Sequence, residues 1–203
     1  MNDTEIPRLV LASGSAARQA MLAAAGIACT IDPPAVDEAG VKAALGAEGA
    51  SAGDVAEALA ELKATRISRR TPGALVLGCD QMLDCEGTWF DKAETLEEAR
   101  ATLQSLRGRT HRLVSAAVIV RDGQRVWHEV AEARLTMRNF SDAFLDGYLV
   151  AAGPGILGSV GCYHIEGLGV QLFDRIQGDT FTIRGLPLLP LLGFLRGWGV
   201  VTP

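Results

Sequence analysis

The first half of the chain alternates short apolar runs with longer amphipathic segments. Residues 9–12 and 74–79 are continuous apolar runs, which is typical of strands that are covered on both faces. Residues 16–25 and 55–69 have apolar positions at helical spacing, and residues 27–31 are predicted to form a further short strand. This alternation predicts a sheet with helices packed against it.

The second half is richer in strands. Two hairpins are predicted, one joining residues 82–84 to 88–90 and the other joining residues 113–120 to 124–137. The remaining predicted elements are helices at 95–106, 142–151 and 186–198, strands at 168–176 and 181–183, and a loop at 35–38. The pattern has no internal repeat and no long linker. It predicts a single domain over residues 1–203, of α/β or α+β class with a mixed sheet.

Composition narrows the classes of function. The chain of 203 residues has a formal net charge of −5, which argues against a protein that coats a polymeric nucleic acid but not against one that binds a nucleotide. No apolar stretch approaches the ~20 residues of a membrane span, and no apolar run follows the acidic first residues. The four cysteines lack zinc spacing and a C-x-x-C pair. We therefore expect a cytoplasmic protein without a membrane segment or a signal peptide.

The turn Ser13-Gly14-Ser15 lies between the first predicted strand and the first predicted helix. Such a turn presents backbone N–H groups, two hydroxyls and the positive end of a helix dipole to one point in space. Arg18, one turn into the helix, adds a planar cation that suits a phosphate. The segment lacks the spacing and the Lys-Ser/Thr of a P-loop. It predicts an anion site at the edge of the sheet, although serine and glycine are also ordinary turn and cap residues.

Two acids and two lysines are candidates for chemistry beside that anion. Asp80 is predicted at the carboxyl end of a buried strand, where ligands bind in open α/β sheets, and Glu38 follows a double proline. Two carboxylates near a phosphate suit Mg²⁺. Lys63 and Lys92 are candidates to reach the same phosphate, and Glu166 lies among glycines that let a ligand approach closely. Each residue is also explained as a cap, a turn residue or a solvated side chain.

Residues 9–22 resemble the signature Leu-Ala-Ser-x-Ser-Pro-Arg-Arg-x-x-Leu-Leu of the Maf family of nucleoside triphosphate pyrophosphatases. Further segments resemble the family's other motifs, in the same order, and together cover residues 8–199. They are Val36-Asp37-Glu38, Gly78-Cys79-Asp80-Gln81, Asp91-Lys92-Ala93, Gly108-Arg109-Thr110-His111, the glycine-rich residues 161–169, and Arg184-Gly185-Leu186-Pro187 in place of Val-Gly-Leu-Pro. An ordered set of this kind is far more specific than any one motif.

The resemblance implies an α/β protein with a mixed central sheet, helices on both sides and two lobes around a cleft, similar to the inosine triphosphatase-like fold and often a homodimer. It implies a hydrolase that cleaves a nucleoside triphosphate between its α- and β-phosphates and so removes modified nucleotides. Asp80 would be the general base, and Glu38 and Asp80 would hold a divalent cation, Mg²⁺ or Mn²⁺. The substrate would be bound by Ser13, Ser15, Arg18, Lys63, Lys92 and Glu166.

The chain departs from the family pattern at several positions. The first of the two signature arginines is Ala17, the residue after the acid is Gln81, and the glutamine of the glycine-rich motif is Glu166. Gln81 and Glu166 resemble the branch that acts on 7-methyl-GTP more than the branch that acts on dTTP and UTP, whereas Ala17 fits neither well. The missing arginine leaves open an alternative function, a nucleotide-binding regulator of cell division with little catalysis.

Overall fold

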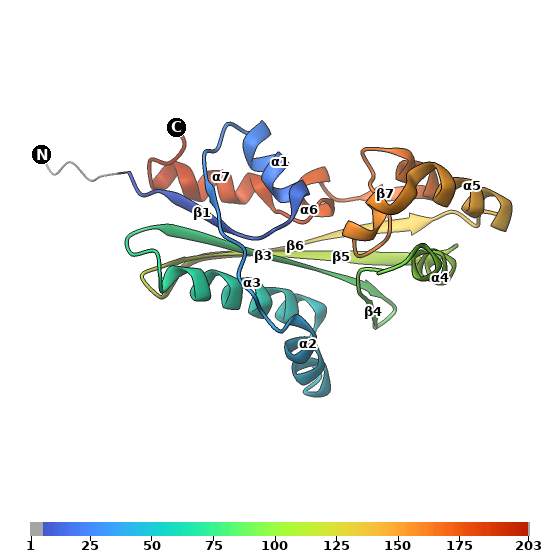
Figure 1. Ribbon diagram of the computed structural model, residues 1–203, viewed down its shortest axis with the longest axis horizontal. Coiled ribbons are helices and arrows are strands. Elements are labelled where there is room, and N and C mark those ends of the chain that lie inside the picture. The colour runs from blue at the N-terminus through green and yellow to red at the C-terminus, as the bar shows by residue number, and fades with distance from the viewer. Residues whose placement is uncertain (1–5, 203) are drawn as a thin grey trace, which may run out of the picture.

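The computed structural model describes residues 6–202 and is built around one seven-stranded mixed sheet (Figure 1). The strand order is β2-β1-β3-β5-β6-β7, and β4 pairs with β3 outside this path. β1 pairs in parallel with β2 and β3, and the other pairs are antiparallel. The strands are β1 (Leu9–Ala12), β2 (Thr30–Ile31), β3 (Leu75–Cys85), β4 (Thr88–Phe90), β5 (Thr110–Arg121), β6 (Gln124–Met137) and β7 (Phe173–Gln177).

Helices cover both faces of the sheet, as predicted (Figure 1). α3 and α2 lie on one face, and α1 and α7 lie on the other. The helices are α1 (Ala16–Ala24), α2 (Glu38–Ala47), α3 (Ala52–Ser68), α4 (Leu96–Leu106), α5 (Asp142–Ala152), α6 (Thr180–Ile183) and α7 (Leu188–Gly197), with 3₁₀ segments at Gly153–Gly158 and Leu168–Leu172. In the part of the chain that the structure describes, no helix combines the length and the apolarity needed to cross a membrane.

The period-two pattern of β3 divides its side chains between three apolar clusters. Val76 and Met82 belong to the cluster beneath α3. On the opposite face, Leu77 belongs to the cluster with α1 and α7, whereas Leu83 belongs to a separate cluster with α4 and α5. Gln81 lies between Leu77 and Leu83 in the strand, at a position on the same face of the sheet. A polar position therefore separates two apolar clusters on that face of the sheet.

The prediction that the buried strand ends at Asp80 is wrong, because β3 continues to Cys85. β5 pairs with β3 along this whole length and places Ala116 opposite Asp80, so the backbone hydrogen bonds have a partner beyond the apolar run. The parallel neighbour β1 ends at Ala12, opposite Gly78. Asp80 therefore lies just beyond the carboxyl end of β1, in the middle of a longer strand.

Three other predicted elements also differ. Residues 181–183 belong to helix α6, because the Asp179 side chain accepts a hydrogen bond from the Thr182 amide at 2.9 Å and caps a helical turn. Residues 168–172 form a 3₁₀ segment, so β7 begins only at Phe173. The predicted loop at 35–38 leads directly into α2, whose N-cap is Asp37, and β2 contains only two of the five predicted residues.

Candidate active site

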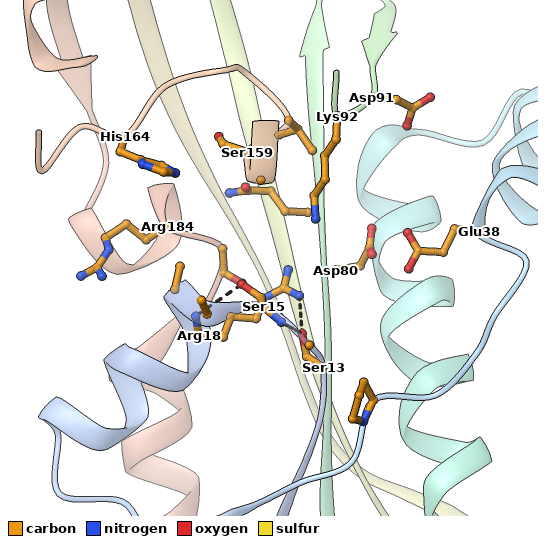
Figure 2. Close-up of a pocket in the computed structure, with 18 of the residues that line it drawn as sticks. Ser13, Ser15, Arg18, Glu38, Asp80, Asp91, Lys92, Ser159, His164 and Arg184 are labelled. Carbon is orange, nitrogen blue, oxygen red and sulfur yellow. Dashed lines mark hydrogen bonds between the residues drawn. The ribbon is translucent and has the colours of Figure 1, made fainter. Parts of the chain in front are cut away.

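A cavity of about 780 Å³ lies where the ends of several elements meet (Figure 2). All eight side chains predicted to bind substrate or metal, or to act as the base, line this cavity. They are Ser13, Ser15, Arg18, Glu38, Lys63, Asp80, Lys92 and Glu166. The structure therefore brings together the residues that the resemblance implied, and it shows how each one is held.

The turn between β1 and α1 forms part of the cavity wall and presents groups that suit an anion. Ser15 is the N-cap of α1, and its hydroxyl accepts a long hydrogen bond of 3.4 Å from the Arg18 amide. The Ser13 hydroxyl accepts hydrogen bonds from the Ser15 amide at 3.3 Å and from Arg18 Nη1 at 3.0 Å. The first turn of α1 carries no acidic residue, so its positive dipole end is not neutralised by its own side chains.

Arg18 is buried, with a relative exposure of 9%. Its Nε donates to the Gly185 carbonyl at 2.8 Å, and its Nη1 donates to the Cys79 carbonyl at 3.0 Å as well as to Ser13. The guanidinium thus joins the β1–α1 turn, β3 and the segment after α6. None of these hydrogen bonds uses Nη2, which leaves two N–H groups of a fixed cation for another acceptor.

The two candidate acids are joined by a buried lysine. Lys63 Nζ lies 2.7 Å from Glu38 Oε1 and 2.7 Å from Asp80 Oδ1. Burial alone would raise the pKa of Glu38, but the contact with Lys63 and its positive charge outweigh burial and hold that pKa below its usual value. Asp80 is only 5% exposed, and its Oδ2 atom has no hydrogen-bond partner among residues 6–202. Asp80 therefore offers one buried acceptor atom for a ligand, a water or a cation.

Lys92 extends from the segment after β4 into the cavity (Figure 2). Burial is the main reason that the pKa of Lys92 is lowered, and the positive charge of Arg18 lowers it further. An anion in the cavity would favour the charged form of Lys92. The neighbouring Asp91 forms an ion pair at 2.6 Å with Lys42 of α2, which links the two walls of the cavity.

Two residues of the site were not predicted to have a role in it. Gln81, noted only as a departure from the family pattern, donates from Nε2 to the Thr182 and Ile183 carbonyls at 3.1 and 3.0 Å. It thereby holds the end of α6 against β3. Arg184, which follows Ile183 at the end of α6, also lines the cavity, and its Nε lies 3.0 Å from Glu166 Oε1. A positive residue in a motif that usually carries valine was the sequence signal that could have indicated this role.

His111 supports the glycine-rich segment from inside the core. It is fully buried, and its Nε2 lies 2.7 Å from the hydroxyl of Tyr163, which lines the cavity. Burial lowers the pKa of His111 to about 4, so the imidazole is neutral near pH 7. In either neutral tautomer, Nε2 can form this hydrogen bond with the Tyr163 hydroxyl, as the donor or as the acceptor.

We expect acid to destabilise the protein through His111. The unfolded chain protonates this residue near pH 6.5, whereas the folded protein does so only near pH 4. The stabilisation that depends on neutral His111 is therefore fully present above pH 6.5 and is lost as the pH falls toward 4. The loss attributable to this group is up to about 3 kcal/mol. Urea unfolding at pH 7 and pH 4.5 measures it, with His111→Phe as the comparison. The same pH dependence in both proteins would contradict the assignment.

Comparison with known proteins identifies the family. A family model described as "Maf-like protein" matches residues 8–198, nearly the whole chain. The chain belongs to the Maf family. A relative from Paramagnetospirillum magneticum, named nucleoside triphosphate pyrophosphatase, is 59% identical over 96% of this chain and 100% of its own length. A relative from Mesorhizobium japonicum, named 7-methyl-GTP pyrophosphatase, is 51% identical over 96% of this chain and 98% of its own length.

Among solved structures, this Maf chain is similar to a nucleoside-triphosphatase, also named dITP/XTP pyrophosphatase, from Mycobacterium abscessus. The similarity has a TM-score of 0.43 and 17% sequence identity, and it covers 94% of this chain and 97% of that chain. The family resemblance expected from the ordered motifs is thus confirmed by the family model and by the curated relatives.

Proposed function

We propose that this Maf protein hydrolyses a nucleoside triphosphate between the α- and β-phosphates, releasing the nucleoside monophosphate and pyrophosphate. The names of its curated relatives support this activity. The observation that carries the proposal is one cavity in which N–H groups, hydroxyls and cations that suit an anion lie near Asp80 (Figure 2), whose Oδ2 has no hydrogen-bond partner among residues 6–202. A triphosphate needs the first set of groups, and an attacking water needs the second.

Asp80 is proposed as the general base. Its buried Oδ2 is free to accept a hydrogen bond from water, while its Oδ1 is held by Lys63 at 2.7 Å. The base takes one proton as the water oxygen bonds to phosphorus and the bond from phosphorus to the bridging oxygen breaks. β3 holds this carboxylate in place, because the strand pairs with β5 through Asp80 and beyond it to Asp84.

The turn at residues 13–15, Arg18 Nη2 and Lys92 are proposed to hold the phosphates. The turn supplies amides and hydroxyls at the positive end of α1, and the two side chains supply charge. These groups oppose the negative charge of the triphosphate and of the leaving pyrophosphate. The loss of an arginine at Ala17 leaves Arg18 as the signature arginine at this turn.

A divalent cation, Mg²⁺ or Mn²⁺, fits the acids of the site. Asp80 Oδ2 is a buried oxygen without a hydrogen-bond partner among residues 6–202, and Glu38 and Asp80 lie close together because both contact the same lysine nitrogen. No group of three or more His, Cys, Asp or Glu in residues 6–202 could hold a metal alone, so phosphate oxygens and waters would complete the coordination, as Mg²⁺ prefers. When bound, the cation would neutralise phosphate charge. Glu38 and Asp80 are the residues proposed to hold it.

Glu166 is proposed to favour a guanine-type base, including 7-methylguanine. A carboxylate accepts hydrogen bonds from the N1–H and amino group of guanine, whereas uracil offers a single N–H flanked by two carbonyls. The name of the Mesorhizobium japonicum relative is in keeping with this preference. A cytoplasmic location and a homodimer stay predictions from the sequence and the resemblance.

A panel of triphosphates tests the proposed function. The purified protein with Mg²⁺ or Mn²⁺ is expected to release pyrophosphate from 7-methyl-GTP and GTP faster than from UTP and dTTP. Tight binding of nucleotides without release of pyrophosphate would favour the alternative, a nucleotide-binding regulator. Faster turnover of UTP or dTTP than of 7-methyl-GTP would reject the base preference while leaving the reaction intact.

We expect the affinity for the triphosphate to depend on the charge of Lys92. Because burial and Arg18 lower the pKa of Lys92, it loses its proton as the pH rises toward 10.5, earlier than an ordinary lysine. Affinity for an α,β-methylene triphosphate, measured by calorimetry, should therefore fall on the alkaline side. Lys92→Arg should move this fall to higher pH, since arginine keeps its proton. Superimposable alkaline profiles of the two proteins would show that another group titrates.

A further inference from the structure

Arg184 and Glu166 form a charged pair that two separate departures from the family motifs create. Glutamate replaces the usual glutamine of the glycine-rich segment, and arginine replaces the usual valine of the closing motif. The structure brings the two side chains together, with Arg184 Nε at 3.0 Å from Glu166 Oε1. Residues that are eighteen positions apart thus contribute opposite charges to one place in the cavity wall.

The pair is poorly explained by stability. The side chains of Glu166 and Arg184 are 43% and 25% exposed, and ion pairs in contact with solvent contribute little to folding. The Arg184 Nε–H is also not aimed at the carboxylate, because this buried nitrogen has no hydrogen-bond partner among residues 6–202. Both residues line the cavity, and the Glu166 side chain is partly exposed, so the pair faces a ligand there.

The position of the pair indicates which part of the substrate it meets. Figure 2 shows Arg184 across the cavity from Glu38 and Asp80. The groups proposed to hold phosphate are cationic or N–H donors, whereas the carboxylate of Glu166 would repel a phosphate. The end of the cavity that holds Glu166 therefore suits the uncharged end of a nucleotide, which is its base.

We propose that Arg184 is a specificity-determining residue that reads the base together with Glu166. Guanine presents an amino group, an N1–H and the O6 carbonyl side by side on one edge. The two oxygens of Glu166 accept from the two donors, and the guanidinium of Arg184 donates to O6. Uracil and thymine place a carbonyl where guanine has its amino group, and that carbonyl would face a carboxylate oxygen. Methylation at N7 leaves the guanine edge intact.

The hydrogen bonds of Gln81 to the Thr182 and Ile183 carbonyls fix the start of the segment that carries Arg184. On the other side of Arg184, the Gly185 carbonyl accepts a hydrogen bond from Arg18 Nε at 2.8 Å. Arg184 therefore projects from a backbone that is anchored before and after it. Such anchoring is what a residue that discriminates between ligands needs, since a mobile side chain adapts to every base.

The test measures binding, because this inference rests on the proposed function and must be separable from it. Calorimetry with Mg²⁺ compares the α,β-methylene triphosphates of guanosine, inosine and uridine. The wild-type protein should prefer the guanosine analogue over the uridine analogue by at least about tenfold. Arg184→Val should lower that preference by about tenfold, and Arg175→Val, which changes an exposed arginine of β7 outside the cavity, should leave it unchanged.

The inosine analogue isolates the role of Glu166, because it lacks only the amino group. Glu166→Gln should narrow the difference between the guanosine and inosine analogues, and the double variant with Arg184→Val should bind uridine and guanosine analogues nearly equally. Arg184→Met, which keeps much of the apolar stem, repeats the test if the valine variant does not fold.

Equal weakening of all three analogues by Arg184→Val would make Arg184 a phosphate contact and overturn the inference. An unchanged preference in that variant, or a wild-type protein without preference, would also overturn it. A base preference in binding without release of pyrophosphate would refute the proposed reaction and leave the inference standing. Release of pyrophosphate without any base preference would support the proposed reaction and overturn the inference about Arg184.

Discussion

Asp80→Asn is expected to reduce the release of pyrophosphate by about a thousandfold. Asparagine has the same shape but cannot take a proton, and it also removes one of the two carboxylates proposed to hold a cation. Binding of an α,β-methylene triphosphate should persist, since the turn at residues 13–15, Arg18 and Lys92 are unchanged. Stopped-time assays with saturating Mg²⁺ measure the loss. Turnover within threefold of the wild-type value would show that Asp80 is not the base.

Asp84→Asn is the matched control for that experiment. Asp84 lies on the same strand and the same face four residues later and is equally buried, at 4% exposure. It forms an ion pair with Arg112 and accepts from the Gly87 amide at 2.8 Å, but it does not line the cavity. Both variants lose a buried charge, so both are expected to be less stable. Only the Asp80 variant should lose activity per folded molecule.

Gly78→Ala is expected to lower the free energy of unfolding by more than about 4 kcal/mol. A Cβ atom at Gly78 would lie 2.0 Å from the Ala60 carbonyl oxygen and 2.8 Å from the Ala64 nitrogen. Both are backbone atoms of α3, so relief requires that the helix move away from the sheet rather than that a side chain rotate. Equilibrium urea unfolding measures the change.

Gly147→Ala is the control for that prediction. Gly147 is exposed on α5, and a Cβ atom there would meet no atom within 4 Å. Alanine in the interior of a helix is favoured over glycine, so this variant should be more stable by about 0.5–1 kcal/mol. A loss at Gly78 no larger than 1 kcal/mol would mean that α3 does not contact β3 as closely as the structure shows.

The sequence predicted which residues line the cavity better than it predicted the contacts that hold them in place. Ser13, Asp80 and Lys92 each belong to a local motif, and the order of the motifs made their meeting predictable. The bridge formed by Lys63 between Glu38 and Asp80 depends on where α3 lies over β3. No spacing along the chain contains that information, because it arises from packing between distant segments.

The errors in the fold also have physical causes. An apolar run ended at Asp80, but a strand continues wherever a neighbour supplies hydrogen bonds, and β5 does so to Cys85. Residues 181–183 are a short apolar segment whose period is ambiguous, and the cap at Asp179 decided in favour of a helical turn. Local patterns therefore predicted the long elements well and the short ones poorly.

The acid that is proposed to activate water belongs to β3, which pairs with β1, β4 and β5, whereas Glu166 and Arg184 project from connecting segments. Substitutions in those connections leave the sheet ladder untouched. Variants at these two positions could therefore change the preferred base while the proposed reaction stays the same. Measuring nucleobase preference across variants of those two positions would therefore show how readily this site changes its preferred base.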